Sequence, residues 1–367
     1  MSADLEFIPQ MRPLFGSEER AELLAYLDED GFFTEFKKTE QFERQIAEYT
    51  GARHAIVVNN GTVSLTLAAL AVGVGPGDDV IVPDYTMIAT PNSIKLLGAN
   101  PVFVDVDPDT LVLDADTVRR SLTPKTRAIM LVSANGRAPA CGIAAFEQLS
   151  RDTGIPLIED AAQSLGSYFP DGRHVGRAGC IGSFSFSAPK IVSTGQGGAL
   201  ITDDGDLAAK LRRLKDFGRA SGGNDVHDSI GYNFKFTELQ ACVGIAQMRK
   251  LPARVARKKE IWQCYQAQLD GVEQLRLFAH DLRITTPWFI DCRAERRDEL
   301  AAHLKSCGIG TRTMYPPIHR QKAYDLPGHY PVAEEIGRSG LWLPSMIQLS
   351  DAQIERICQA IRAFYQG

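Results

Sequence analysis

Short apolar runs alternate with amphipathic stretches along the first two-thirds of the chain. The apolar runs, each bounded by turn residues, have the length and composition of strands, and the stretches between them have helical spacing. We expect strands over residues 54–58, 79–83, 102–106, 127–132, 156–160 and 181–186. Strands that alternate with helices predict an α/β fold with a mostly parallel, doubly wound sheet.

Helix boundaries follow from capping residues and glycine stops. We expect helices from Ser17 to a stop at Gly31 and from about Phe42 to Gly51, and further helices over residues 62–72, 114–122, 143–153 and 204–217 and from Thr237 onward. Residues 1–16 are expected to form an extended arm, and residues 218–223 a loop.

The last third of the chain has a different pattern. Residues 251–269 form a long predicted helix whose basic positions (Arg254, Arg257, Lys258 and Lys259) are interpreted as a solvated face. A strand over 286–291, a helix over 297–306 and a final helix after the Ser350 capping box then predict a smaller α+β domain. Because 367 residues exceed the usual size of one core, we divide the chain into residues 1–250 and 251–367.

Composition excludes several classes of protein. The net charge of −5 and the absence of a basic run argue against a nucleic-acid partner. The seven cysteines are scattered without a C-x-x-C pair, which argues against a metal site or a disulfide framework and favours the cytoplasm. The polar N-terminus is unlike a signal peptide, and no apolar run approaches the roughly 20 residues of a membrane span.

Charged side chains follow two of the predicted strands. The run 156–160 ends in Glu159 and Asp160, and the run 181–186 is followed by Lys190. Ligands of open α/β sheets bind beyond the carboxyl ends of the strands, so we expect Asp160 and Lys190 to face one crevice. Such a pair suits pyridoxal phosphate, because the lysine forms a Schiff base and the acid keeps the pyridine nitrogen protonated. From these two residues alone, a surface salt bridge is the simpler interpretation.

The surrounding motifs favour the cofactor. Glu159 to Gln163 read EDAAQ, Phe184 to Lys190 read FSFSAPK, and Ser193 to Gly198 end in a glycine-rich turn. These strings resemble the DegT/DnrJ/EryC1/StrS family of pyridoxal-phosphate-dependent sugar aminotransferases over nearly the whole chain. The resemblance implies a fold-type I aminotransferase with a large and a small domain, working as a homodimer with shared active sites.

The resemblance also assigns roles to single residues. Lys190 binds the cofactor, Asp160 pairs with its ring nitrogen, and Gln163 reaches its 3′-oxygen. The turn after strand 54–58 resembles the family's phosphate-binding turn, a weak signal alone, because many such turns contain Gly-Thr. The implied contacts to the phosphate are Gly61, Thr62, Ser185 and, from the second subunit, Asn233. Met87 stands where the family has a ring-stacking aromatic, with Tyr85 as a possible substitute, and Tyr315 and His319 border the implied substrate.

The implied reaction moves an amino group from glutamate to a nucleotide-linked keto-deoxy sugar, for cell-surface polysaccharide or glycosylated natural products. An example is the C4 ketone of GDP-4-keto-6-deoxymannose. Residues 32–38, Met87 and residues 133–137 depart from the family pattern around the pocket. They leave open an aminotransferase for a cyclitol or another non-nucleotide ketone, and a non-catalytic sensor. A sugar dehydratase on the same scaffold is disfavoured, since it would carry histidine where this chain has Lys190.

Overall fold

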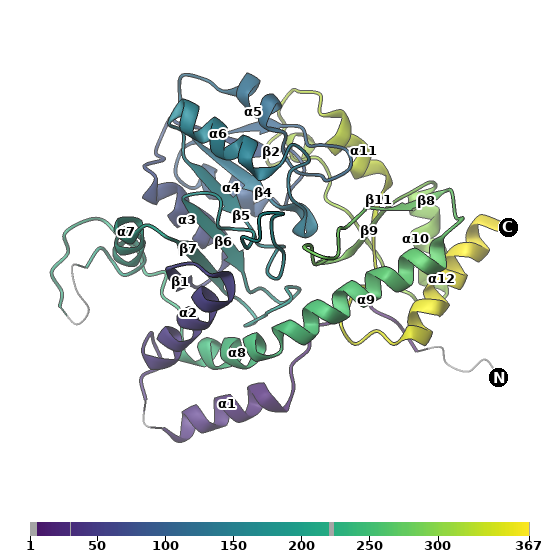
Figure 1. Ribbon diagram of the computed structural model, residues 1–367, viewed down its shortest axis with the longest axis horizontal. Coiled ribbons are helices and arrows are strands. Elements are labelled where there is room, and N and C mark those ends of the chain that lie inside the picture. Colours follow the sequence, from purple (N-terminus) through teal and green to yellow (C-terminus); the bar gives the residue numbers. More distant parts are fainter. Residues whose placement is uncertain (1–5, 30, 220–223, 367) are drawn as a thin grey trace.

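A seven-stranded sheet forms the centre of the larger part of the molecule (Figure 1). The computed structural model describes residues 6–29, 31–219 and 224–366. The strand order is β1-β7-β6-β5-β4-β2-β3, and β7 runs antiparallel to both of its neighbours while the other pairs are parallel. The strands are β1 (His54–Val58), β2 (Asp79–Pro83), β3 (Asn100–Val104), β4 (Thr126–Val132), β5 (Leu157–Asp160), β6 (Ile181–Ser185) and β7 (Gly198–Thr202).

The sheet buries both faces. Neighbouring residues of one strand enter different cores, with Val57 in one and Ile56 in the other, because successive strand side chains point to opposite sides. Helices α2 (Lys37–Thr50), α6 (Ile143–Thr153) and α8 (Glu238–Arg249) contribute to the first core. Helices α3 (Gly61–Ala71), α4 (Ala89–Lys95) and α7 (Gly205–Lys215) contribute to the second. The predicted doubly wound α/β fold is therefore confirmed; α5 (Ala115–Ser121) also occurs as predicted.

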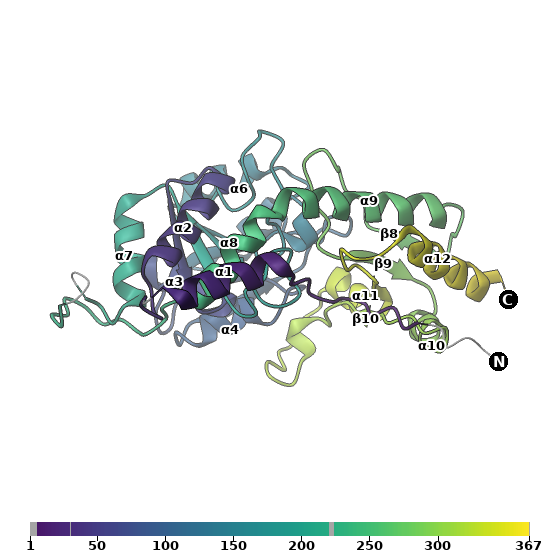
Figure 2. The ribbon, with the colours of Figure 1, turned by 90° about the horizontal axis from the view of Figure 1, so that it is seen from below.

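A smaller antiparallel sheet has the order β10-β11-β9-β8 and its own core. Its strands are β8 (Leu275–Leu277), β9 (Ile290–Ala294), β10 (Arg312–Thr313) and β11 (Gly340–Leu343), accompanied by α10 (Arg297–Ser306), α11 (Pro331–Ser339) and α12 (Asp351–Gln366). Helix α9 (Leu251–Leu269) runs from the large part into this part (Figures 1 and 2). Ile8 of the N-terminal arm also lies in the small core, bridged to Ile309.

Several predicted elements end or begin elsewhere. Strand β3 lies two residues before the predicted range 102–106, and α2 begins at Lys37 rather than near Phe42. Helix α1 (Ser17–Asp28) ends before Gly31. The strand predicted from residue 286 begins only at Ile290, because the preceding backbone is bound by side chains of the large part. The N–H of Thr286 donates to Ser167 Oγ and that of Phe289 to Asn135 Oδ1. Pro287 also lacks the backbone N–H group that would donate a hydrogen bond to a neighbouring strand.

The solvated basic face predicted on α9 is wrong for two of its four residues. Arg254 is 4% and Lys258 3% exposed. Both lie on the stripe that also carries Trp262, because residues four apart share one helix face. The guanidinium of Arg254 donates to the carbonyls of Ile191 and Leu14, so this face of α9 packs against other parts of the chain.

Two structural absences can be stated for residues 6–29, 31–219 and 224–366. No helix there is long and apolar enough to cross a membrane. No group of three or more His, Cys, Asp and Glu residues is arranged to hold a metal ion. The predicted loop at 218–223 lies partly outside the described residues, as do the first five residues of the arm.

Candidate active site

Two adjacent carboxylates at the end of β5 serve different neighbours. Glu159 is fully buried and accepts hydrogen bonds from the N–H groups of Gly176, Ala178 and Gly179 at 2.9, 2.6 and 2.7 Å. Asp160 points to the other side of the strand, because side chains alternate there. Glu159 is therefore committed to holding the loop before β6, and Asp160 is the acid available to a site.

Asp160 is buried but keeps hydrogen-bonding partners. Thr90 Oγ1 donates to its Oδ2 at 2.8 Å, and the N–H of Ala162 donates to its Oδ1 at 3.2 Å. Burial raises the pKa of Asp160, and the Thr90 hydrogen bond and the charge of Lys190 oppose that shift. A cation placed beside this carboxylate would stabilise its charged form.

Lys190 follows β6 and lies within the influence of Asp160. Burial lowers the pKa of Lys190 to about 8, against the opposing charge of Asp160, while Arg312 lowers it further. Its Nζ lies 4.0 Å from the centre of the Trp288 ring. A cavity beside it is lined in part by Gln163, Ser185, Lys190, Thr286 and Trp288. The amine can thus lose its proton near neutral pH beside a small cavity.

A close approach of β6 to the N-terminus of α3 forms the second part of the site. A Cβ on Gly61 would lie 2.9 Å from Ser185 Cβ and 3.0 Å from its Oγ, so only glycine fits there. Asn60 caps the helix by accepting the N–H of Val63 at 2.9 Å. The N–H groups of the first turn, including those of Gly61 and Thr62, have no partners within the helix, and the helix dipole favours an anion beside them.

Gln163 lines the cavity beside Lys190, and its side-chain orientation is fixed by the loop after β4. Its Oε1 accepts the backbone N–H of Asn135 at 2.7 Å. The amide nitrogen is left to donate elsewhere, since each amide has one acceptor and one donor end.

The two candidates for ring stacking differ in exposure. The side chain of Met87 is 46% exposed, whereas Tyr85 is buried, with its ring 5.8 Å from that of Tyr315. Tyr315 is also buried and packs edge-on against Trp342. Of the two, Met87 is therefore the one whose side chain is free to cover a bound ring, and a thioether packs well on a π-face.

The structure separates His319 and Asn233 from the cavity beside Lys190. His319 is buried, and its Nδ1 and backbone N–H contact the carboxylate of Asp84 at 2.7 and 2.8 Å. Burial raises the pKa of Asp84, and the contacts from His319 oppose this shift. His319 thus fastens the segment after β10 to the end of β2. Asn233 is exposed and forms an isolated bridge with Asp216 beyond α7.

Sequence reasoning assigned no role to three residues near the site: Thr90, Trp288 and Arg312. Thr90 holds Asp160, Trp288 covers Lys190, and the charge of Arg312 acts on Lys190. Thr90 and Arg312 each lie three residues from a position that the resemblance assigned, Met87 and Tyr315, and this proximity was the available signal. Trp288 gave only a strand signal.

The chain is similar to known proteins over nearly its whole length. The DegT/DnrJ/EryC1/StrS aminotransferase family matches residues 15–362. The chain is 34% identical to a GDP-perosamine synthase of Escherichia coli O157:H7, over 98% of this chain and 99% of that one. It is 33% identical to a GDP-perosamine synthase of Caulobacter vibrioides, over 98% of both.

Solved structures give the same result. The chain resembles S. venezuelae DesV with a TM-score of 0.89 at 33% identity, covering 97% of this chain and 99% of that one. It resembles 3-amino-5-hydroxybenzoic acid synthase with a TM-score of 0.90 at 28% identity, covering 98% and 100%. A third neighbour, DesI in the presence of its TDP-sugar product, has a TM-score of 0.90 at 30% identity, over 99% and 94%.

Proposed function

Because the chain belongs to the DegT/DnrJ/EryC1/StrS aminotransferase family, we propose that it moves an amino group from glutamate to a keto-deoxy sugar carried on a nucleotide. It is a pyridoxal-phosphate-dependent transaminase. The GDP-perosamine synthases support a GDP-linked 4-keto-6-deoxyhexose as the acceptor, since they align with this chain from end to end. The place of action is the cytoplasm, where nucleotide-linked sugars and glutamate are available.

One observation carries the proposal. Lys190, with its pKa lowered to about 8, faces the buried Asp160 across a site whose anion-binding turn touches Ser185. Pyridoxal phosphate requires three groups: a lysine, an acid that pairs with the ring nitrogen, and a turn that binds the phosphate. Because residue 61 is glycine, that turn can approach Ser185 closely. When bound, the cofactor supplies an electron sink for the substrate's α-carbon.

The protein's own residues then perform separable tasks. Asp160 holds positive charge at the ring nitrogen, and Thr90 keeps the carboxylate oriented. Lys190 Nζ takes the proton from the α-carbon of the amino donor as general base, for which a pKa near the working pH is best. Gly61, Thr62 and Ser185 bind the phosphate, and Gln163 donates to an oxygen of the ring. Tyr315 borders the sugar side, and His319 acts only indirectly, because its contacts with Asp84 fix the segment after β10.

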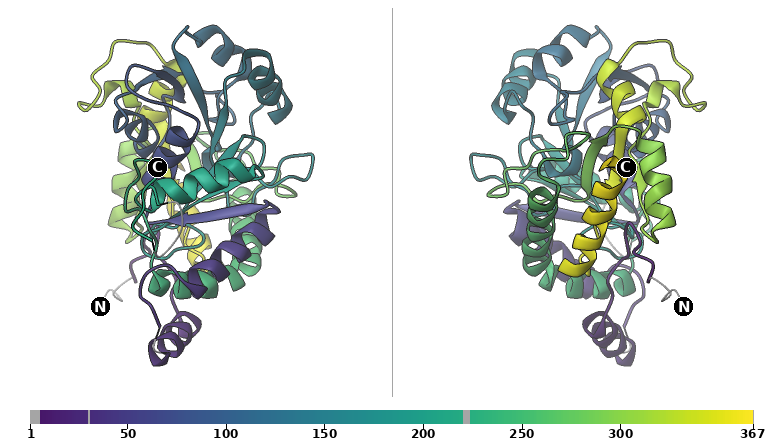
Figure 3. Two further views of the ribbon diagram at one scale, coloured as in Figure 1. Left: turned by 90° about the vertical axis from the view of Figure 1, so that its left-hand side faces the viewer. Right: turned by 90° about the vertical axis from the view of Figure 1, so that its right-hand side faces the viewer.

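We propose that two chains share each site, with Asn233 of one completing the phosphate contacts of the other. Helix α1 and the described residues 216–219 and 224–232 after α7 stand out from the body, α1 lying outermost below α2 and α8 (Figures 1 and 3). Large apolar side chains are exposed on α1 (Leu24 and Leu27), on the segment between α1 and α2 (Phe32, Phe33 and Phe36) and on the segment after α7 (Ile230 and Tyr232). These exposed apolar side chains favour a protein interface. A second copy of this chain is the partner that fits, because Asn233 directly follows the exposed Tyr232.

A subunit-mixing experiment tests the shared site. Asn233→Ala should weaken cofactor retention, and Lys190→Ala should be inactive. When the two chains are mixed at limiting cofactor, activity should exceed that of either alone, because one site of the mixed dimer then has both residues intact. Mixtures that form dimers but are no more active than either chain alone would show that the sites are independent.

The reaction itself is tested with purified holoenzyme, L-glutamate and a panel of keto substrates. We expect 2-oxoglutarate to form with a GDP- or dTDP-linked 4-keto-6-deoxyhexose and not with an inosose of comparable size. Turnover of the inosose alone would favour a cyclitol aminotransferase. Binding of cofactor without turnover of either substrate or of glutamate would favour a sensor.

A further inference from the structure

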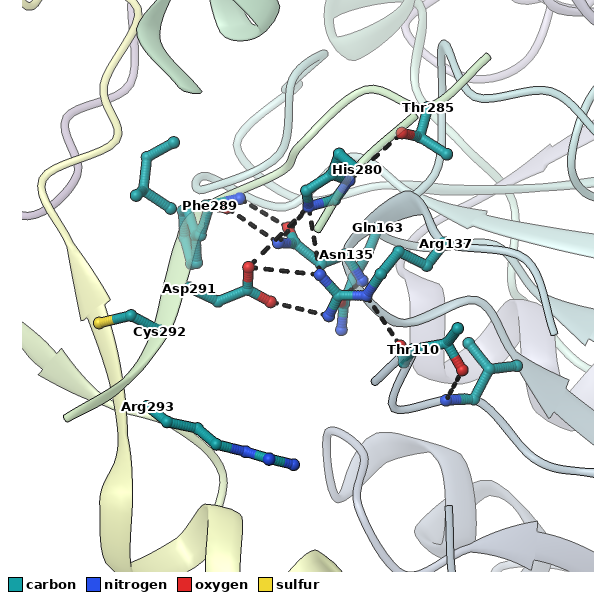
Figure 4. A network of polar contacts seen from close by, with 12 residues as sticks. Thr110, Asn135, Arg137, Gln163, His280, Thr285, Phe289, Asp291, Cys292 and Arg293 are labelled. Atoms are coloured by element: carbon teal, nitrogen blue, oxygen red, sulfur yellow. Dashed lines mark hydrogen bonds and ion pairs between the residues drawn. The ribbon is translucent and has the colours of Figure 1, made fainter. Parts of the chain in front are cut away.

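A buried polar cluster joins the loop after β4 to the start of the small sheet (Figure 4). Arg137 lies in that loop and Asp291 on β9; their side chains meet at 2.8 Å, and they are 4% and 1% exposed. His280 Nε2 lies 3.1 Å from Arg137 Nη1. Burial raises the pKa of Asp291, but the charge of Arg137 and the hydrogen bonds outweigh it and hold the pKa below its ordinary value. The cluster is therefore an ion pair across the two parts of the chain.

Asn135 extends this contact into the backbone. Its Oδ1 accepts the N–H of Phe289 at 2.8 Å, and its Nδ2 donates to the carbonyl of Phe289, also at 2.8 Å. One side-chain amide thus satisfies both polar groups of a residue just before β9, as a neighbouring strand would. Asn135 itself has φ 53° and ψ 30°, a left-handed conformation that asparagine tolerates better than most residues.

The same residue acts on the candidate cofactor site from the other side. Its backbone N–H donates to Gln163 Oε1, as Figure 4 shows. The direction of this bond is fixed, because a backbone N–H can only donate. Gln163 therefore has its oxygen held by the loop, and its amide nitrogen is the end left for the cavity beside Lys190.

We propose that Asn135 is a positioning residue, which ties the amide orientation of Gln163 to the contact between the two parts of the chain. Fastened to Phe289, the turn keeps its left-handed conformation and its N–H aimed at Gln163. Gln163 then presents a donor, so the group it meets on the cofactor must be an acceptor such as an oxygen carrying negative charge. This inference rests on the proposed use of pyridoxal phosphate but not on the identity of the sugar.

The test is a double-mutant cycle read out by cofactor retention. Holoenzyme is dialysed against graded pyridoxal phosphate, and the bound fraction is measured by absorbance. Asn135→Gly keeps the positive φ and removes the side-chain amide; we expect it and Gln163→Ala each to weaken retention about five- to tenfold, the size of one hydrogen bond. The double variant should be no weaker than Gln163→Ala alone, because both changes act through one contact. Wild-type retention by Asn135→Gly, or effects that multiply, would overturn the proposal.

Two further variants guard the interpretation. Should Asn135→Gly fail to fold, Asn135→Asp decides, since a carboxylate can accept the N–H of Phe289 but cannot donate to its carbonyl. Retention should fall, and unchanged retention would overturn the proposal.

Arg276→Ala is the matched control, because the exposed Arg276–Asp109 pair also joins the two parts, at 3.1 Å, without reaching Gln163. It should retain cofactor like the wild type, and weakening equal to that of Asn135→Gly would contradict a specific role. If the variants change cofactor retention as expected but the protein turns over no keto sugar, only the proposed substrate is refuted.

Discussion

Two desolvated lysines, the half-buried Lys190 and the buried Lys258, make an instructive pair. Burial lowers the pKa of both, to about 8 for Lys190 and to about 7 for Lys258. Lys258 Nζ donates to the backbone carbonyls of Trp288, at 2.6 Å, and of Ser345. Lys190 instead faces the carboxylate of Asp160, the ring of Trp288 and a cavity.

The difference shows that a lowered pKa does not by itself identify a reactive amine. Desolvation acts on any lysine removed from water. Lys258 uses its protons to join α9 to the segments before β9 and after β11, and nothing in that arrangement leaves room for a substrate. Lys190 has a low pKa together with a nearby acid and a small cavity, and this combination suits covalent and proton-transfer chemistry.

The largest contrast is expected from removing each amine in turn. Lys190→Ala should lower turnover by about a thousandfold or more, because it removes both the covalent attachment and the general base. The fold and the oligomer should be unchanged. Steady-state turnover with circular dichroism and size-exclusion chromatography checks this, and retained transamination would refute the role.

Asp160→Asn should have the next largest effect. An uncompensated buried charge costs about 3–5 kcal/mol, so we expect turnover to fall by a factor of about 160 to 5,000. The pKa of Lys190 should also fall below about 8, because the charge of Asp160 raises it in the wild type. The pH dependence of the reaction between the protein and pyridoxal phosphate measures that shift; an unchanged profile would separate Asp160 from Lys190.

Lys258→Met should change stability and leave turnover within about threefold. Two backbone carbonyls lose their donor, each worth about 1 kcal/mol or more, and a buried amine is removed. A lysine with pKa lowered from 10.5 to about 7 destabilises the fold fully below about pH 7 and is relieved as the pH rises. Between about pH 7 and 10, the free energy of unfolding of the wild type should therefore rise relative to that of Lys258→Met, by at most about 1.4 kcal/mol per pH unit.

Urea unfolding of the apoprotein at several pH values measures this difference in the free energy of unfolding. A difference that does not depend on pH would mean that Lys258 titrates as an ordinary lysine.

The smallest effect is expected at Trp288, which touches both lysines. Its ring favours the charged form of Lys190 by about 0.5–1 kcal/mol, so Trp288→Leu should lower the pKa of Lys190 by less than one unit. Trp288→Phe is the control, since it keeps a ring and loses only the bond from Nε1 to the carbonyl of Pro189. Equal pKa values in the two variants would exclude a contribution from the ring.

Much of the fold and the pairing of Asp160 with Lys190 could be predicted from the sequence, whereas the burial of Lys258 was not. Apolar runs bounded by turn residues predicted β1, β2 and β5 closely. Helical spacing and capping residues predicted the bounds of α6, α9 and α10. The rule that ligands gather beyond parallel strands predicted that Asp160 and Lys190 would face each other, and their charges do act on one another. Local spacing and one topological rule were sufficient for these features.

Long-range packing was not predictable in the same way. Basic residues on α9 looked solvated by composition, yet Lys258 and Arg254 fall on the apolar stripe with Trp262, a spacing that could have been noticed. The late start of β9 depends on side chains about 120 and 154 residues away along the sequence, at Ser167 and Asn135. No local pattern carries such information.

The most direct measurement is the identification of the lysine that binds the cofactor. Holoenzyme is reduced with borohydride, digested, and its peptides are weighed by mass spectrometry. We predict the mass of the reduced cofactor on the peptide that contains Lys190 and an unmodified Lys258. Modification of Lys258, or a protein that takes up no cofactor at all, would contradict the assignment of the site.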